Sequence, residues 1–229
     1  MNIIGFVIGD GDGSPEFMRQ ATAWQEWNEN QGHNCILHTL AVSTKPLAAR
    51  YPEVEKLLKA ESQEVSQVAF FCHGWADGLQ LCAKNKIKNL AQAIRPTTYD
   101  NIRVTLYACS TAASPDRPDA ASDGVGGDNG FADLLRDALC AEGAVNCQVD
   151  AHTCKGHTTK NPYLRRFEGL GVNTGGIGGQ WLVTPGSQQW KLWSAALKAE
   201  KAPWLKSELR WRFPFMSAVG IHDYLARQK

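Results

Sequence analysis

The sequence predicts an α/β fold in which a doubly wound, mostly parallel sheet is flanked by helices. Apolar segments of strand length alternate with helix-length segments along roughly the first 155 residues, which is the pattern of a sheet covered by helices. Several apolar segments carry hydrophobic residues at consecutive positions, as strands buried on both faces do. At 229 residues, the chain is also long enough to bury one large core.

The first predicted strand covers residues 3–8 and leads through the loop "GDGDGS" into a helix. Ser14 can cap that helix, and Pro15 suits its first turn. Hydrophobic spacing marks one face of the helix before Gly32 ends it, at Phe17, Ala21, Trp24 and Asn28. The later elements are predicted as strands over residues 35–42, 68–72, 102–110 and 146–154, and as helical stretches over residues 46–60, 86–94 and 131–141.

The pattern becomes less regular beyond residue 158. A Gly-rich segment, "GVNTGGIGG", precedes a strand predicted over residues 180–184, and a basic, Trp-rich tail follows. We therefore expect a catalytic α/β core over residues 1–158 and a C-terminal extension over residues 159–229, with its tryptophans packed on the core. Residues 111–130 form a polar connection that is too long for an ordinary turn and follows the fourth strand directly.

The composition disfavours several classes of partner. The chain has 43% hydrophobic and 21% charged residues and a formal net charge of +1, so no overall charge favours nucleic acid or an anionic membrane. No segment approaches the roughly 18 apolar residues that would span a membrane, and the amino terminus lacks the features of a signal peptide. Seven cysteines, an odd number, favour reduced thiols in a cytoplasm. We expect a cytoplasmic protein that needs no cofactor.

Reactive side chains follow two of the predicted strands. His73 and Gly74 end the third strand, and Cys109 ends the fourth. Ligands bind at the carboxyl ends of strands in open α/β sheets, and neighbouring strands lie only about 4.8 Å apart. An imidazole beside a thiol can take its proton during attack. The amides of Gly74 and Cys109 could stabilise an oxyanion, because a glycine lets the backbone approach a substrate carbonyl.

A hydrophobic strand ending in His-Gly, followed by one ending in Ala-Cys, resembles the caspase-like (clan CD) cysteine peptidases, which include caspases, metacaspases, legumains, gingipains and separases. The resemblance covers roughly residues 1–155. It implies a caspase-like α/β/α sandwich, a catalytic dyad of His73 and Cys109, an oxyanion hole at Gly74 and Cys109, and a protein or peptide as substrate. A regulatory protein partner is also conceivable.

The same resemblance bears on specificity. Family members commonly use the loop after the first strand to line the pocket for the residue before the scissile bond, and here that loop offers Asp10 and Asp12. Carboxylates at these positions would favour Arg or Lys in the substrate. The chain departs from metacaspases, which carry an acid where Tyr107 stands. It also lacks the arginine that caspases carry after the first strand, which disfavours cleavage after aspartate.

Alternative interpretations remain at this point. The segment "FFCHGWADG" resembles the His-Gly oxyanion segment of α/β-hydrolase esterases, but no nucleophile elbow occurs. A non-catalytic caspase-like interaction module would carry the same fold. A zinc site is weakly suggested by one group of residues, and the tail's tryptophans could contact nucleic acid or a membrane surface, although neither partner is expected. The zinc group is Cys147, His152, Cys154 and His157.

Overall fold

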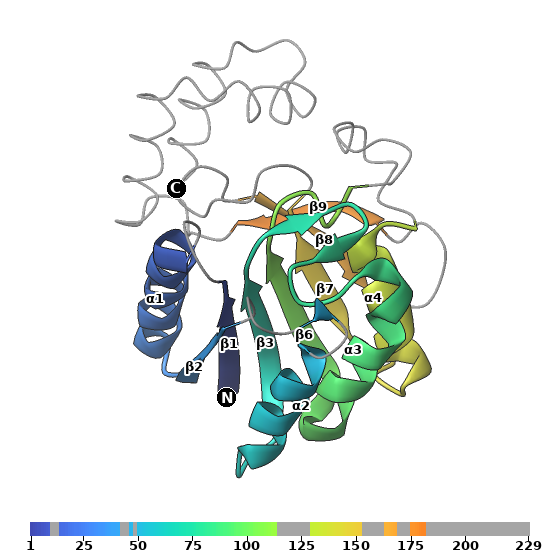
Figure 1. Cartoon of the computed structure of the whole chain (residues 1–229). Coiled ribbons are helices and arrows are strands. Elements are labelled where there is room, and N and C mark those ends of the chain that lie inside the picture. Colours follow the sequence, from blue (N-terminus) through green and yellow to red (C-terminus); the bar gives the residue numbers. More distant parts are fainter. Residues whose placement is uncertain are drawn as a thin grey trace, which may run out of the picture.

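A computed structural model gives the fold of the chain (Figure 1). It describes residues 1–9, 14–41, 46–47, 50–113, 129–152, 163–168 and 175–181. The predictions for Asp10, Asp12, Cys154, His157 and the Trp-rich tail fall on residues outside these ranges, as does most of the connection over residues 111–130.

A seven-stranded sheet forms the centre of the described structure, in the order β2-β1-β3-β6-β7-β8-β9. Its first five strands are parallel, while β8 pairs antiparallel with β7 and β9 antiparallel with β8. The mostly parallel α/β sheet predicted from the sequence is thus confirmed. The strands are β1 (Asn2–Ile8), β2 (Asn34–Leu40), β3 (Val65–Phe71), β6 (Thr98–Tyr107), β7 (Gln148–Ala151), β8 (Tyr163–Glu168) and β9 (Gly175–Trp181).

Helices cover both faces of this sheet. Helix α1 (Ser14–Asn30) packs on one face, where Phe17, Ala21 and Trp24 are buried with β1 and β3 side chains, as their spacing predicts. The opposite face carries α2 (Tyr51–Ala60), α3 (Ile87–Ile94) and α4 (Phe131–Ala141), as Figure 1 shows. Burying one large apolar side chain contributes about 1.5–3 kcal/mol to folding. The many buried side chains in the two layers therefore stabilise the packing of the helices on the sheet. Two 3-10 turns, η2 (Lys84–Lys86) and η3 (Arg95–Thr97), flank α3.

Strand β8 was not predicted from the sequence. Its segment "YLRRFE" buries Leu164 in the α1-side layer and Phe167 in the opposite layer. Leu164 and Phe167 lie three residues apart and so face opposite sides of the sheet, as strand alternation requires, but the two arginines between them leave no apolar run to recognise. The pairing with β9 shifts register between Arg165 and Phe167. The antiparallel partner β9 begins at Gly175, within the segment interpreted as a Gly-rich loop, and not at Gln180 as predicted. Glycine has little intrinsic strand preference, so backbone pairing with β8 sets this strand.

The core sheet consequently continues beyond the predicted domain boundary. Strands β8 and β9 belong to it, so it extends past residue 158 as far as Trp181. A small hairpin was also missed. It consists of β4 (Gly74–Trp75) and β5 (Gly78–Leu79), which pair antiparallel directly after β3. Strands of two residues are too short to show any periodicity.

Candidate active site

The sheet has a topological switch point at the carboxyl ends of β1 and β3. Strand β2 lies on one side of β1, whereas β3, β6 and β7 follow in that order on its other side. Helix α1, which follows β1, and α3, which follows β3, lie on opposite faces. The two connections therefore diverge there, and in open α/β sheets such a point is where ligands bind. His73 comes two residues after the end of β3 and thus lies at this point.

The α1 layer contacts the His73 side chain directly. The ring of Phe17, on α1, lies edge-on to the imidazole of His73 with 4.8 Å between ring centroids. Phe17 is buried whereas His73 is exposed. An aromatic ring edge against the imidazole restricts its orientation while leaving the ring accessible to solvent.

Strand pairing brings His73 and Cys109 to the same edge. Phe71 and Tyr107 are register partners in the parallel β3–β6 pair, and their rings stack 4.5 Å apart in the α1-side layer. His73 and Cys109 each follow two residues later. Because side chains alternate between the faces of a sheet, continuing this alternation assigns both residues to the α1 side.

Gly74 packs against the end of β6. A Cβ atom at this position would lie 2.8 Å from the Cβ of Ala108, 2.8 Å from Cγ2 of Thr111 and 3.0 Å from the carbonyl oxygen of Cys109. No side chain fits in that space, so glycine is required for the two strand ends to meet. The sequence predicts glycine here for another purpose, which is to let the backbone approach a substrate carbonyl. The contact with β6 is a separate reason for glycine at this position.

A tight turn follows Cys109. Ser110 has a φ of 57°, which is uncommon for a residue other than glycine. The turn is held by a hydrogen bond from Ala113 N to Ser110 O at 3.1 Å and by one from the Thr111 hydroxyl to Ala108 O at 3.2 Å. Residues in sparsely populated backbone conformations gather at functional sites and persist where the surroundings hold them. The half-buried Cys109 is thus presented at a rigid corner.

The β4–β5 hairpin fixes the segment after His73. Gln80 N donates to His73 O at 2.9 Å, and the Gln80 side chain accepts from His73 N at 3.4 Å. Trp75 leaves 45% of its surface exposed on this hairpin. A Cβ on Gly78 would lie 3.2 Å from Nε1 of Trp75, so the Trp75 indole lies against that glycine. Sequence reasoning missed Trp75, although a large exposed aromatic beside a candidate site could serve as a ligand contact.

The amino terminus of α4 links the two segments of the site. Phe131 N donates to Ala76 O, in the hairpin, at 3.3 Å, and Ala132 N donates to Thr111 O, in the turn after Cys109, at 2.9 Å. The first amides of a helix have no partner within the helix. Here two of them bind the segments that follow His73 and Cys109, so α4 restrains both.

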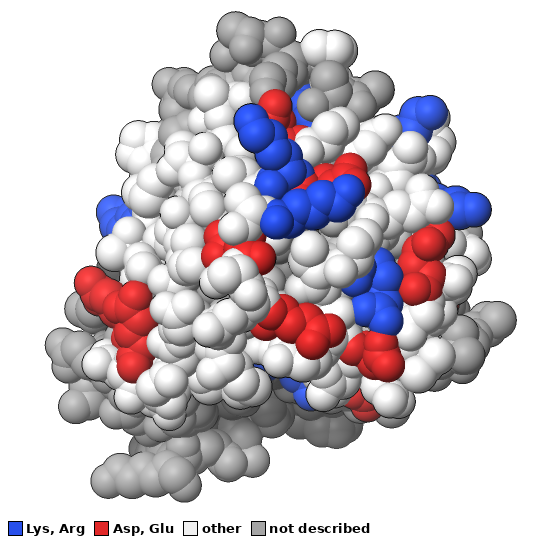
Figure 2. Space-filling view, turned by 90° about the horizontal axis from the view of Figure 1, so that it is seen from below, with Lys and Arg blue, Asp and Glu red and all other residues white. Residues whose placement is uncertain are grey.

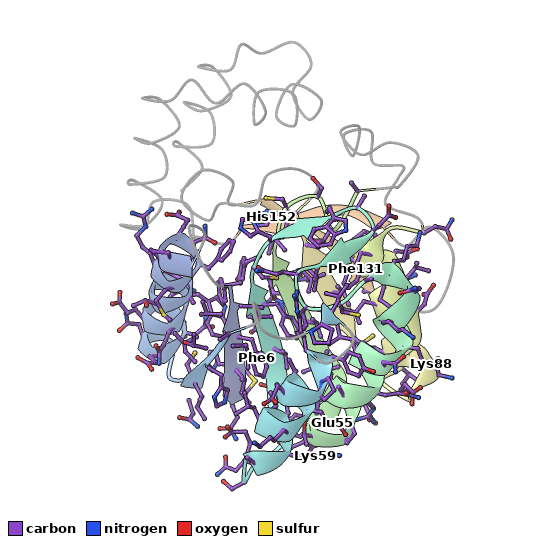
Figure 3. The ribbon with its side chains drawn as sticks, viewed as in Figure 1. Phe6, Glu55, Lys59, Lys88, Phe131 and His152 are labelled. Atoms are coloured by element: carbon purple, nitrogen blue, oxygen red, sulfur yellow. The ribbon has the colours of Figure 1, made fainter. Side chains whose placement is uncertain are left out.

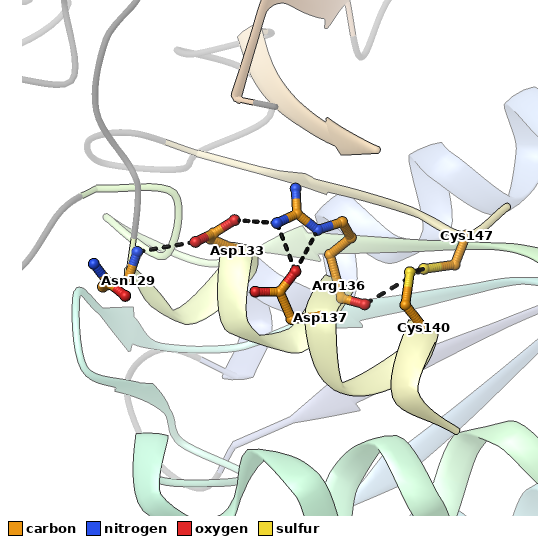
Figure 4. Close-up of polar contacts among 6 residues, drawn as sticks. All are labelled: Asn129, Asp133, Arg136, Asp137, Cys140 and Cys147. Carbon is orange, nitrogen blue, oxygen red and sulfur yellow. Dashed lines mark hydrogen bonds and ion pairs between the residues drawn. The ribbon is translucent and has the colours of Figure 1, made fainter. Parts of the chain in front are cut away.

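Buried charges on the first turns of α4 support this contact (Figure 4). The guanidinium of Arg136 is fully buried and donates to Asp133 Oδ1 at 2.6 Å and to Asp137 Oδ1 at 2.6 Å. Asp133 Oδ2 accepts from Asn129 N at 2.9 Å. The carboxylate of Asp133 thereby joins the buried cation to the backbone that enters the helix.

A second histidine lies at the same edge of the sheet (Figure 3). His152 is buried directly after β7, its carbonyl accepts from Ala112 N at 2.9 Å, and its ring lies 6.2 Å from that of Tyr107. The sequence analysis considered His152 only as a metal ligand. Its position after a buried strand was the same signal that identified His73.

A charged cluster lies on the α1 side of β6, β7 and β8. The buried carboxylate of Asp150 accepts from Arg103 Nε at 2.7 Å and from Arg166 Nε at 2.9 Å. Asp150 in turn raises the pKa of Arg166. Burial raises the pKa of the Tyr107 hydroxyl, which the charge of Arg103 partly offsets. Tyr107 is therefore a neutral packing residue at physiological pH.

Exposure separates Cys109 from the other described cysteines. It is half-buried, whereas the other five are buried. Burial raises the pKa of Cys72, the residue before His73, to about 12, with a further contribution from the nearby Cys109. A buried neutral thiol is a poor nucleophile, so Cys109 is the described cysteine best placed to react.

The proposed zinc ligands separate as far as they are described. Cys147 belongs to the core under α4, whereas His152 contacts Tyr107 in the α1-side layer. Within the described ranges, no three His, Cys, Asp or Glu residues gather as a metal site. Nor does any helix in these ranges have the length and apolarity to cross a membrane.

The end of the molecule opposite the site carries charges of both signs. Figure 2, seen from the end where the parallel strands begin, shows acidic and basic side chains interspersed. This face presents no broad area of one sign, which nucleic acid or an anionic surface would require.

Comparisons with known proteins give little information. No protein-family model matches the chain, and no curated protein matches it. Among solved structures, it is weakly similar to octopine dehydrogenase, in a structure described with NADH and L-arginine. The identity is 13% and the TM-score 0.33, and the match covers 79% of this chain but only 40% of that one. So distant a likeness carries no argument about function, and the α/β assignment rests on the strand order and helix placement.

Proposed function

We propose that this protein is a caspase-like cysteine endopeptidase with Cys109 as nucleophile and His73 as general acid and base. The observation that carries the proposal is the β3–β6 pairing, in which Phe71 and Tyr107 are partners and His73 and Cys109 each follow two residues later. The packing of Gly74 against Ala108 and the edge contact of Phe17 support it.

The proposed reaction needs no group from outside the chain except water. Cys109 Sγ attacks the peptide carbonyl carbon, its proton passes to His73, and the amides of Gly74 and Cys109 stabilise the oxyanion. The C–N bond breaks as His73 returns the proton to the leaving amine. Water, deprotonated by His73, then hydrolyses the thioester and releases the acid and the free Cys109 thiol.

The primary specificity is proposed to be for Arg or Lys. It depends on Asp10 and Asp12, which lie in the sequence between Ile8, the last residue of β1, and Ser14, the first residue of α1. A carboxylate facing a substrate cation in a partly dry pocket discriminates strongly against acidic and neutral side chains. Fluorogenic peptides that differ only in the residue before the cut test this choice. Preference for Asp over Arg would overturn the pocket assignment without affecting the dyad.

Alkylation of Cys109 tests the dyad itself, but selectivity alone is insufficient. Cys109 is also the most accessible described thiol, so iodoacetamide would favour it even without activation. The informative comparison is the alkylation rate near pH 6.5 in the wild type and in His73→Ala. His33→Ala, which removes a histidine before β2, is the matched control.

We expect His73→Ala to slow the alkylation of Cys109 and His33→Ala to leave the rate unchanged, because an imidazole beside the thiol can take its proton during attack. An unchanged rate, together with peptide turnover that survives Cys109→Ala, would reject the mechanism.

The two other candidate functions give different results. An interaction module of the same fold would show no peptide turnover and no effect of His73→Ala on alkylation. An esterase would hydrolyse activated esters but leave the matching amides intact. Substrates that differ only in ester against amide therefore separate the α/β-hydrolase interpretation from a peptidase.

A further inference from the structure

We propose that Cys140 and Cys147 are a redox-active dithiol that closes to a disulfide by exchange with small-molecule disulfides of the glutathione class. Their sulfur atoms lie 3.5 Å apart in the interior of the protein (Figure 4). Neither cysteine lies at the strand ends that carry the candidate active site, and neither takes part in the proposed peptidase reaction.

The connection between α4 and β7 brings the two thiols together. Cys140 lies in the last turn of α4, and Cys147 comes directly before β7. The chain reverses between them through Gly143, whose φ of 95° favours glycine. Hydrogen bonds hold the reversal, from Gly143 N to Cys140 O at 3.0 Å and from Cys147 N to Ala144 O at 3.0 Å. The approach of the two sulfurs is therefore built into the backbone.

Little movement separates this contact from a bond. A disulfide joins two sulfurs at about 2.05 Å, so the two atoms need to approach by about 1.5 Å. Because backbone hydrogen bonds cap this helix end, a small disulfide reaches Cys140 only when the last turn of α4 opens locally. The sulfur of Cys147 also contacts Arg136 O at 3.6 Å, a weak interaction that is given up on oxidation.

The environment of the two thiols sets the order of the exchange. Cys140 is 6% exposed, while Cys147 is fully buried. Burial, together with the hydrogen bond to Cys140, raises the pKa of Cys147 to about 12. The more accessible Cys140 therefore reacts first when the helix end opens, and Cys147 acts as the resolving thiol.

The steps balance. The Cys140 thiolate, having lost its proton to water, attacks the small disulfide, forms a mixed disulfide and releases one small thiolate. While the helix end is open, the Cys147 thiol gives its proton to water and attacks the sulfur of Cys140, which closes the Cys140–Cys147 bond and releases the second small thiolate. The protein loses two electrons and two protons, and one small disulfide is reduced to two thiols.

Mass spectrometry of the intact, full-length chain tests the pair. The protein is equilibrated at increasing ratios of oxidised to reduced glutathione, quenched in acid and alkylated under denaturing conditions. Cleavage after Glu142 and before Asp137 and Asp150 places Cys140, Cys147 and Cys154 on different peptides. We expect a linked pair of the peptides covering residues 137–142 and 143–149, lighter by two hydrogens than the reduced pair, which dithiothreitol separates.

Matched serine variants complete the test. Cys147→Ser should abolish the linked pair and leave Cys140 either free or carrying glutathione, whereas Cys82→Ser, which removes a buried thiol elsewhere, should retain it. The proposal is overturned if Cys140 and Cys147 both remain alkylatable at every ratio, or if Cys140 links to a different cysteine. Because the readout needs no catalysis, these outcomes do not depend on peptidase activity.

Discussion

Replacing Gly74 by alanine is expected to disturb the junction between the two candidate catalytic strands. The new Cβ would lie 2.8 Å from Ala108 Cβ and from Thr111 Cγ2, against at least 3.4 Å for an ordinary contact. The ends of β3 and β6 would therefore have to separate by about 0.6 Å, the difference between these distances. Overpacking of this kind costs about 1–3 kcal/mol of folding free energy.

The same displacement should reduce catalysis, because His73 and Cys109 lie on the two segments that move apart. A misplacement of about 1 Å costs about 100-fold in rate, so a shift of somewhat more than half that size should lower kcat/KM by about 10- to 100-fold. Urea denaturation measures the first effect. Peptide turnover, or the alkylation rate of Cys109 near pH 6.5, measures the second.

Two further variants isolate the contact. Thr111→Ser removes the Cγ2 atom that the new Cβ would meet but keeps the hydroxyl, so Gly74→Ala combined with Thr111→Ser should recover part of the lost stability. Gly143→Ala introduces strain in the turn between α4 and β7, where φ is 95°, at the end of the sheet where the parallel strands begin. This control should destabilise the protein, while the turnover per folded molecule stays unchanged.

If Gly74→Ala is as stable as the wild type, Gly74 does not pack against Ala108 and Thr111 as described. A loss of stability without any change in turnover or alkylation would separate the packing role of Gly74 from the proposed chemistry. Thr111→Ser alone also loses a buried methyl group, so the two substitutions are compared in a double-mutant cycle, and a coupling energy of zero would exclude Thr111 as the partner in the clash.

Four other effects follow from buried groups. Asp150→Ala leaves two half-buried arginines without their shared carboxylate and should cost about 2–4 kcal/mol in urea denaturation. Asp133→Ala removes a carboxylate that pairs with the buried Arg136 and should cost a similar amount. Closing the eight-residue ring between Cys140 and Cys147 should stabilise the oxidised protein by about 2.5 kcal/mol in the chain-entropy model, and equal midpoints for both redox forms would contradict this. Because the pKa of Cys147 is raised to about 12, reduced protein should lose stability as pH rises above about 8.5, the usual thiol pKa, and Cys147→Ser should lose less.

Several elements could be predicted because their signals are local. Helix α4 spans Phe131–Ala141 as its apolar spacing indicated, with Gly130 before it and Gly143 after it. Strand β3 was recognised from its continuous apolar run, with limits that differ by a few residues. In both cases the burial pattern repeats within a few residues of chain, so it can be read without knowing what the segment packs against.

Other features depended on partners distant in the sequence. Strand β9 is a strand because β8 pairs with it, and β8 itself has two arginines in its middle, so it shows no apolar run that would have revealed it. The contact between the Cys140 and Cys147 sulfurs depends on how the chain turns between them. The burial of Arg136 is likewise a consequence of α4 docking, since the sequence shows only a charged residue among acids.

The sequence by itself determined that a histidine-glycine pair and a cysteine each follow a buried strand. Periodicity and burial are properties of neighbouring residues, so one chain suffices to read them. The tertiary structure decided that β3 and β6 are adjacent and parallel, that Gly74 lies against Ala108, and that α4 donates amides to both segments. Strand order is set by the packing of all helices and strands together, and no short stretch of sequence encodes it.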